Sequence, residues 1–157
     1  MTNRAVSKEQ SLQASSRMVK LWRPDSWFIL VTDDDSPTRT TVADALTTSG
    51  YQIRLASTAT ESFEIARHEY LHLAILDHNL PDLTGLEAAR LLRQITGRPM
   101  PCILMSGERL EAKLLESVAL EVWQFMPKPV DLGFLRRAVH DALVKHYVPD
   151  SRSEGGQ

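Results

Sequence analysis

The sequence contains little of what marks a secreted, membrane-spanning or nucleic-acid-binding protein. A single cysteine, Cys102, excludes an internal disulfide framework and a cysteine metal site, and its place in an apolar run predicts a buried thiol. No segment approaches the length of a transmembrane helix, and the N-terminus has no apolar run typical of a signal peptide. The net charge of -2 and the pI near 6.2 indicate no strong attraction to nucleic acids or membranes. We therefore expect a cytoplasmic protein that binds neither DNA nor membranes directly.

The length and composition predict one soluble globular domain with short extensions. The chain has 157 residues, of which 43% are hydrophobic and 24% charged. We expect an N-terminal extension over residues 1–25, a domain over 26–147 and a flexible tail over 148–157. The extension is polar, and we predict that it is either an amphipathic helix docked on the domain or a disordered lead-in, with partial helix favoured. Its scattered apolar residues are Leu12, Met18, Val19, Leu21 and Trp22.

Between the extensions, short apolar runs alternate with helical patterns. Runs rich in Ile, Leu and Val suggest strands buried on both faces; they lie at 27–31, 51–56, 71–76, 102–105 and 122–126. Apolar stripes at helical spacing fall between or after them, namely Ala88, Leu91, Leu92 and Ile95, then Leu132, Leu135, Val139, Ala142 and Leu143. Pro37 suits a first helical turn, and Asp131 suits an N-cap. This alternation predicts an α/β protein, with an open parallel sheet covered by helices on both faces.

Polar side chains follow four of the predicted strands. The first strand is followed by Asp33, Asp34 and Asp35, and the third by Asp77. Ser106-Gly107 follows the fourth strand, and Lys128-Pro129 follows the fifth. Ligand sites in open α/β sheets lie beyond the carboxyl ends of the strands. We therefore expect these side chains to line one pocket.

The chemistry of such a pocket is consistent with phosphoryl transfer. Crowded carboxylates repel one another, and a hard divalent cation such as Mg²⁺ relieves that repulsion. A carboxylate such as Asp77 can attack phosphorus to form an acyl phosphate. An ammonium group such as Lys128 neutralises charge on the transferred group, and Ser106 can donate a hydrogen bond to it.

From about residue 27 to 146, the sequence resembles the receiver domain of bacterial two-component response regulators. The segments that carry the resemblance are Ile29-Leu30-Val31-Thr32-Asp33-Asp34-Asp35, Leu76-Asp77-His78-Asn79-Leu80-Pro81-Asp82-Leu83-Thr84-Gly85-Leu86, Ile103-Leu104-Met105-Ser106-Gly107 and Phe125-Met126-Pro127-Lys128-Pro129. The resemblance implies a flavodoxin-like (βα)5 fold, a doubly wound parallel sheet with strand order 2-1-3-4-5. It also implies a phosphoacceptor switch, which assists its own phosphorylation and dephosphorylation, rather than an enzyme.

By this resemblance, Asp77 accepts the phosphoryl group. Asp34 and Asp77 would bind Mg²⁺ directly, together with the backbone carbonyl of Asn79, and Asp33 would bind it through water. Asp35 falls one place beyond the acid pair of the family, so we expect it to lie outside the ligand set.

The resemblance also assigns the switch and the partners. Lys128 would contact the phosphoryl group, Ser106 would supply the switch hydroxyl, and Phe125 would be the aromatic residue whose ring moves with it. The phosphodonor would be a histidine kinase or a histidine phosphotransfer protein. The output would pass to a downstream protein target through the fourth helix, the fifth strand and the fifth helix, and homodimerisation is left open.

Several positions depart from the usual pattern of the family. Glu121 replaces a glycine that would end the fourth helix in a left-handed conformation, so the shape of that helix end is open. Trp123 is expected to be a half-exposed aromatic residue rather than a partner anchor. His78 is expected to point away from the pocket, and His72 to be structural rather than a metal ligand.

Three rival functions are less consistent with the sequence. A hydrolase of the haloacid-dehalogenase class would need a second acid two residues after its nucleophile, where this chain has Asn79. A nucleotide-binding module would need a glycine-rich phosphate loop after the first strand, and that loop is missing. A receiver-like adaptor that binds partners without phosphorylation is the more serious rival, although every expected pocket residue type is present.

Overall fold

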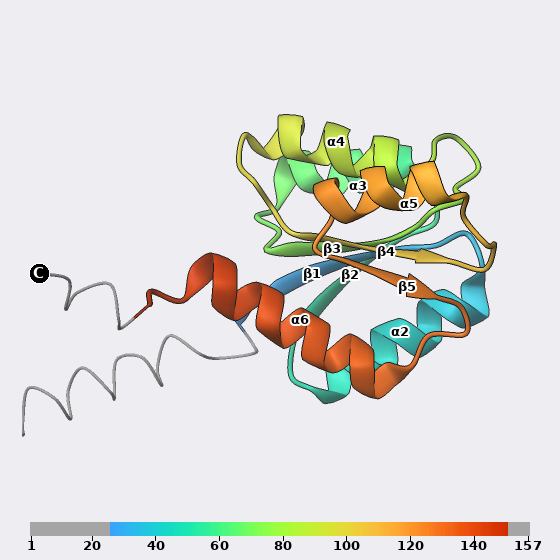
Figure 1. Cartoon of the computed structure of the whole chain (residues 1–157). Coiled ribbons are helices and arrows are strands. Elements are labelled where there is room, and N and C mark those ends of the chain that lie inside the picture. Colours follow the sequence, from blue (N-terminus) through green and yellow to red (C-terminus); the bar gives the residue numbers. More distant parts are fainter. Residues whose placement is uncertain (1–25, 151–157) are drawn as a thin grey trace, which may run out of the picture.

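The structure is a computed structural model that describes residues 26–150. The predicted extension over 1–25 and the last seven residues of the predicted tail lie outside the described residues. Strands and helices alternate along the chain (Figure 1). Their bounds are β1 Phe28–Thr32, α2 Ser36–Thr48, β2 Gln52–Ala56, α3 Ala59–His68, β3 Leu73–Asp77, α4 Gly85–Thr96, β4 Cys102–Ser106, α5 Ala112–Glu121, β5 Gln124–Pro127 and α6 Leu132–Tyr147. None of the described helices is both long and apolar enough to cross a lipid bilayer.

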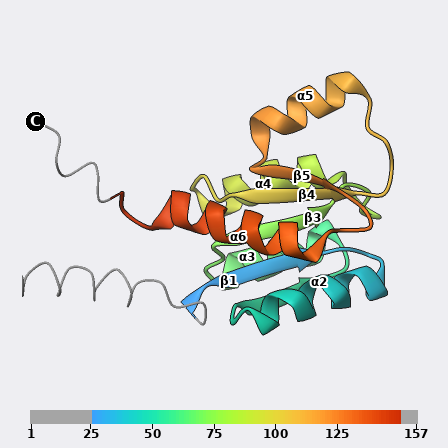
Figure 2. The same cartoon turned by 60° about the horizontal axis from the view of Figure 1, so that its bottom comes forward.

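The strands form one parallel five-stranded sheet in the order β2-β1-β3-β4-β5. Helices α3, α4 and α5 cover one face of the sheet, and α2 and α6 cover the other (Figures 1 and 2). The predicted fold class and strand order are confirmed. Because all strands run in the same direction, their carboxyl ends meet along one edge of the sheet, which we call the carboxyl-end edge.

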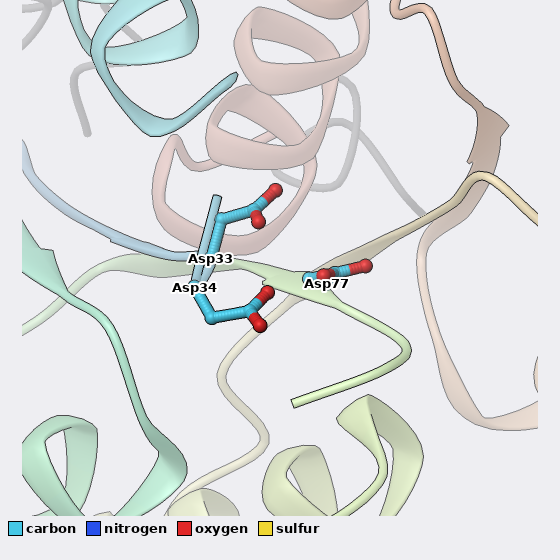
Figure 3. Close-up of side chains that lie close together, drawn as sticks. All are labelled: Asp33, Asp34 and Asp77. Carbon is cyan, nitrogen blue, oxygen red and sulfur yellow. The ribbon is translucent and has the colours of Figure 1, made fainter. Parts of the chain in front are cut away.

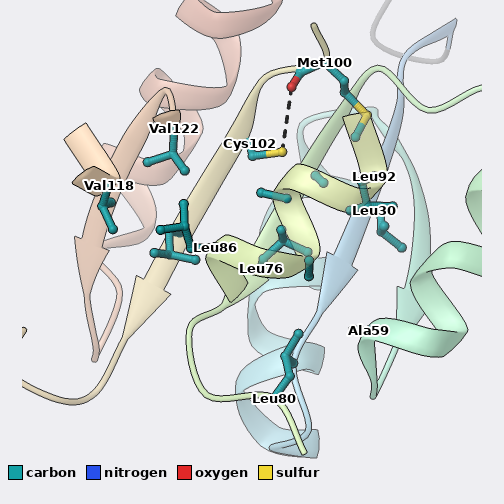
Figure 4. Close-up of a cluster of buried hydrophobic side chains, with 14 of the residues drawn as sticks. Leu30, Ala59, Leu76, Leu80, Leu86, Leu92, Met100, Cys102, Val118 and Val122 are labelled. Atoms are coloured by element: carbon teal, nitrogen blue, oxygen red, sulfur yellow. Dashed lines mark hydrogen bonds between the residues drawn. The ribbon is translucent and has the colours of Figure 1, made fainter. Parts of the chain in front are cut away.

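Two hydrophobic cores lie on the two faces of the sheet. Alternate residues of the central strands point to opposite faces, so that Leu30 and Leu76 join one core (Figure 4) and Ile29 and Ile75 join the other. Cys102 is fully buried, as predicted, and burial raises the pKa of its thiol to about 11. An inert structural thiol results.

The prediction that all five strands are buried on both faces is wrong for the two outer strands. Every residue of β3 and β4 is buried, but β2 and β5 include exposed and half-buried positions. Each outer strand has only one neighbouring strand, so part of the surface of β2 and of β5 stays open to solvent.

The helix ends follow the predicted signals. Asp131 caps α6 by accepting a hydrogen bond from the Phe134 amide at 2.9 Å, and Pro37 lies in the first turn of α2. Helix α5 ends without a left-handed glycine. The chain instead leaves the helix at Val122, which is extended, with φ of -117°. Glu121 instead forms a bidentate ion pair with Arg90 of α4, with both N–O distances at 2.7 Å.

Candidate functional site

Three carboxylates gather at the carboxyl-end edge, where β1 and β3 end. Ligand oxygens of Asp33, Asp34 and Asp77 all lie within 4.8 Å of one another (Figure 3). The first two belong to the loop that follows β1, and Asp77 is the last residue of β3. Because β1 and β3 are neighbours in the sheet, two segments far apart in the sequence bring their acids together.

Lys128 reaches this acid cluster from the end of β5. Its Nζ donates to Oδ2 of Asp33 at 2.7 Å and lies 3.3 Å from Oδ1 of Asp77. Its backbone amide donates to the Ser106 carbonyl at 2.8 Å, which fixes the start of the β5–α6 loop against the end of β4. Burial alone lowers the pKa of Lys128, but the hydrogen bond and charge of Asp33 outweigh it and raise the pKa. The side chain is therefore a firmly charged ammonium.

Asp77 is buried, with 5% of its surface exposed. Burial, and secondarily the charge of Asp33, raise its pKa to about 6, although Lys128 opposes the shift. The Asn79 amide donates a long hydrogen bond, 3.4 Å, to Oδ1 of Asp77. Because ionisation of Asp77 is costly in this pocket, a bound cation or a covalent modification would stabilise the side chain.

The three consecutive acids have different environments. Asp33 is fully buried, and both its oxygens have protein partners, since Oδ1 accepts from the Asp35 amide at 2.9 Å and Oδ2 from Lys128. Asp34 is exposed and joins the cluster. Asp35 caps α2, accepting from the amide of Thr38 at 3.1 Å. Its side chain is thus engaged away from the cluster.

Ser106 and Phe125 line one cavity beside the site. The cavity measures about 360 Å³ and extends from Lys128 to α5; it is also lined by Leu110 and Leu115. The Ser106 hydroxyl is bonded to the backbone of Glu108, accepting from its amide at 3.1 Å. Phe125 is half-buried and packs against the core under α3, α4 and α5. The ring of Phe125 and the hydroxyl of Ser106 therefore border the same cavity.

A glycine allows α4 to start directly against the end of β3. A Cβ on Gly85 would lie 2.5 Å from the Asp77 carbonyl oxygen and 2.5 Å from a methyl group of Leu104. The Gly85 amide donates to the His78 carbonyl at 2.8 Å, closing the loop that holds Asn79. Any larger residue here would displace the backbone that carries Asp77.

Two contacts at this edge were not predicted from the sequence. Arg39, in the first turns of α2, donates to the Asp33 carbonyl at 2.6 Å and so braces the loop after β1. Asp82 accepts from the amides of Ala59 and Thr60 at 3.0 and 2.9 Å, which joins the loop after β3 to the start of α3. A basic residue one turn after the acid cluster is the only sequence signal for Arg39, and none exists for Asp82, whose partners are more than twenty residues away.

Within the part of the chain that the structure describes, the two histidines singled out from the sequence form no hydrogen bond with the three carboxylates. His78 is buried, and no hydrogen bond joins its ring to Asp77 among the described residues. His72 accepts from the Phe28 amide at 3.1 Å, and its ring packs edge-on against Trp27 and Tyr147. Burial, then the charge of Arg98, lower the pKa of His72 to about 4. It is a neutral, structural residue.

Comparison with known proteins decides the family. Residues 29–140 match the protein family described as the response regulator receiver domain. The chain belongs to this family. Receiver domains are the phosphoacceptor modules of two-component systems, and the acid cluster described above lies within the matched residues.

Relatives and solved structures agree with this assignment. The protein named response regulator MprA of Mycobacterium leprae (strain TN) is 29% identical over 126 residues, which are 80% of this chain and 54% of that protein. The chain thus spans about half the length of the curated relatives it matches. A CheY-like receiver domain protein of Methanospirillum hungatei JF-1 has a TM-score of 0.69 at 25% identity, over 76% of this chain and 94% of that one. A receiver protein of Pseudomonas putida has a TM-score of 0.67 at 26% identity, over 73% and 96%.

Proposed function

We propose that this receiver domain, over residues 26–147, accepts a phosphoryl group on Asp77 in a reaction that depends on Mg²⁺. The observation that carries the proposal is the position of Lys128 Nζ, 2.7 Å from Asp33 and 3.3 Å from Asp77, beside three clustered carboxylates. An ammonium group and a magnesium site on either side of one carboxylate are what charge neutralisation in phosphoryl transfer requires.

The side chains at the site fit a magnesium ion. Asp34 and Asp77, with the backbone carbonyl of Asn79, would hold it, and Asp33 would contribute through water because its own oxygens already have protein partners. The raised pKa of Asp77 comes from burial and then from the charge of Asp33, and a divalent ion with oxygen ligands would offset both. When bound, the ion would neutralise charge on the phosphoryl oxygens.

The residues of the chain then divide the transfer step among them. An Asp77 carboxylate oxygen forms a bond to phosphorus, and the bond from phosphorus to the donor breaks, so that the donor leaves with the electron pair and takes up a proton. Lys128 stabilises one phosphoryl oxygen, and Ser106 donates to another. Ser106 must leave its bond with Glu108 to do so, which couples phosphorylation to movement of the loop after β4.

The output would pass through the face formed by α5, β5 and α6. Inward movement of Ser106 vacates part of the cavity that it shares with Phe125, and the ring of Phe125 can then turn inward. Only contacts that differ between the two states shift the equilibrium, and the new bonds of Ser106 and Lys128 to phosphate provide them. We propose that the protein acts in the cytoplasm, with a histidine kinase or a histidine phosphotransfer protein as the donor and a downstream protein as the target, and homodimerisation stays open.

Phosphorylation with a small donor tests the proposal. Incubation with acetyl phosphate and Mg²⁺ should add one phosphoryl group per chain, detected as a mass increase of the intact protein. Chelation of Mg²⁺ and the variant Asp77→Asn should both abolish it. Asp35→Asn is the matched control, since asparagine also caps helices, and it should be labelled like the native protein. Full labelling of Asp77→Asn would refute the proposal, and absence of labelling in the native protein would favour a phosphorylation-independent adaptor.

A further inference from the structure

A groove with an apolar wall lies at the opposite edge of the sheet, where the strands begin. We call it the amino-end groove; it measures about 420 Å³ and is lined by Arg93, Pro99, Met100, Pro101, Leu120, Glu121, Val122, Trp123 and His146. Leu120 is 88% exposed and Trp123 is 37% exposed. Leu120, in the last turn of α5, and Trp123, just before β5, thus expose two large hydrophobic side chains on the wall of the same groove. Exposed apolar side chains that gather on one wall of a groove are typical of an interaction surface.

The amino-end groove continues toward the start of the described chain. A smaller hollow of about 120 Å³ shares Pro99 and His146 with it and extends to Tyr147. The Tyr147 ring packs against the ring of Trp27, with centroids 5.4 Å apart, and Trp27 directly precedes β1. The amino-end groove and the smaller hollow together therefore extend to the point where residues 1–25 join the domain.

The composition of the two undescribed ends selects the occupant. Residues 151–157, Ser-Arg-Ser-Glu-Gly-Gly-Gln, contain no hydrophobic side chain and have nothing to bury in an apolar groove. Residues 12–22 contain Leu12, Met18, Val19, Leu21 and Trp22. A segment with these side chains gains free energy from a covered apolar surface.

The connection is also long enough. The start of β1 is three strands away from the start of β5, with β3 and β4 between them, which is about 14 Å at the usual spacing of about 4.8 Å. Trp22 lies five positions before Trp27, and a stretch of this length spans up to about 17 Å when extended. Trp22 can therefore lie beside Trp123 without any change in the described domain.

We propose that residues 12–22 of this chain dock in the amino-end groove, with Leu21 and Trp22 covering Leu120 and Trp123. The contact would tie the N-terminal segment to the end of α5 and the end of α6. It is independent of the acid cluster, which lies at the other edge of the sheet.

Nuclear magnetic resonance on the full chain tests the proposal. In the double variant Leu21→Ser/Trp22→Ser, amide shifts should move at Leu120, Glu121, Val122, Trp123 and His146 and should stay unchanged at Asp33, Asp77 and Lys128. The control Asn3→Ser, outside the proposed contact, should move neither set. Unchanged shifts at the groove in the double variant would overturn the proposal.

Cross-linking distinguishes this chain from other occupants. Under mild oxidation, Leu21→Cys/Leu120→Cys should form an intramolecular disulfide several-fold faster than Leu21→Cys/Arg109→Cys, because Arg109 lies at the carboxyl-end edge and a disulfide requires Cα atoms within about 7 Å. The native Cys102 is fully buried and should not compete. Equal rates for the two pairs, or disulfide-linked dimers in place of the intramolecular bond, would contradict docking in cis, and dimers would identify a second copy as the occupant.

Discussion

The carboxyl-end edge and the amino-end edge of the sheet differ in how their charged side chains are surrounded. At the carboxyl-end edge, three carboxylates lie within 4.8 Å, and burial with like charge raises the pKa of Asp77 to about 6. At the amino-end edge, the Arg98 guanidinium and the Tyr147 hydroxyl form hydrogen bonds, and Arg98 also lies over the ring of Tyr70. Burial and like charge oppose ionisation of Asp77 at one edge, whereas the hydrogen bonds at the other edge contribute stability. The acid cluster and the hydrogen bonds of Arg98 and Tyr147 thus lie at opposite ends of the strands.

Arg98 is the centre of the amino-end edge. It donates from Nη1 to the Tyr147 hydroxyl at 2.8 Å and from Nη2 to the Leu71 carbonyl, and it lies 3.9 Å from the centroid of the Tyr70 ring. The Tyr147 hydroxyl in turn donates to the His72 carbonyl at 2.7 Å. The network joins the end of α6 to the residues just before β3, and it adds to the burial of Leu135, Val139 and Leu143 of α6 in the core.

The largest effect on stability is expected from Arg98→Ala. It removes two charged hydrogen bonds and a cation–π contact and leaves the Leu71 carbonyl without its partner, so the free energy of unfolding should fall by about 3 to 4 kcal/mol. Urea denaturation of the full chain measures it. Arg109→Ala, an exposed loop residue at the other edge, should change it by less than about 0.5 kcal/mol. Equal effects of the two substitutions would remove the contrast between the edges.

His72 should make the amino-end edge sensitive to acid. Its pKa is about 4 in the folded protein, lowered by burial and then by Arg98, and about 6.5 when unfolded. The unfolded chain therefore binds more protons between these values, and the free energy of unfolding should fall as the pH drops from 6.5 to 4, by about 3 kcal/mol at most.

Replacing His72 isolates this contribution. The variant His72→Gln cannot be protonated, so its stability should fall less than that of the native protein over the same pH range. His68→Gln is the control, because 76% of the His68 side chain is exposed, and it should follow the native curve. Parallel curves for His72→Gln and the native protein would show that His72 is not held neutral.

A smaller effect of opposite sign is expected at the carboxyl-end edge. Because the pKa of Asp77 is raised above its unfolded value, the ionised side chain destabilises the fold without Mg²⁺, increasingly as the pH rises from about 4 to 6. Asp77→Asn should raise the free energy of unfolding at pH 7 by about 1 to 2 kcal/mol. Mg²⁺ should stabilise the native protein and have little effect on the variant. Thermal denaturation with and without Mg²⁺ measures both, and a variant less stable than the native protein would contradict the repulsion described here.

The carboxyl-end edge was the more predictable of the two. Asp34, Asp77 and Lys128 follow directly from strand ends, because parallel topology brings the residue after each strand to the same place whatever the details of packing. The capping role of Asp131 and the place of Pro37 in a first helical turn were likewise readable, since each rests on local pattern, whereas the strand order came from the resemblance to the receiver family.

The amino-end edge could not be read in the same way. Arg98 contacts Leu71 and Tyr147, which are 27 and 49 residues away, and no local signal distinguishes it from a surface arginine. The substitution of glycine by Glu121 could be noticed, but its partner Arg90 is fixed only by how α4 and α5 pack. The partial exposure of the outer strands β2 and β5 was not predicted for a related reason, because an apolar run does not reveal whether its strand has neighbours on both sides.

Chemical mapping of the phosphorylated residue tests the central claim most directly. Borohydride reduces an aspartyl phosphate to homoserine, so the native chain, treated with acetyl phosphate and Mg²⁺ and then reduced and digested, should contain homoserine at position 77 alone. Aspartate should persist at positions 33 and 34. Homoserine at either of those positions, or phosphate retained on His78, would contradict the assignment of Asp77 as the acceptor.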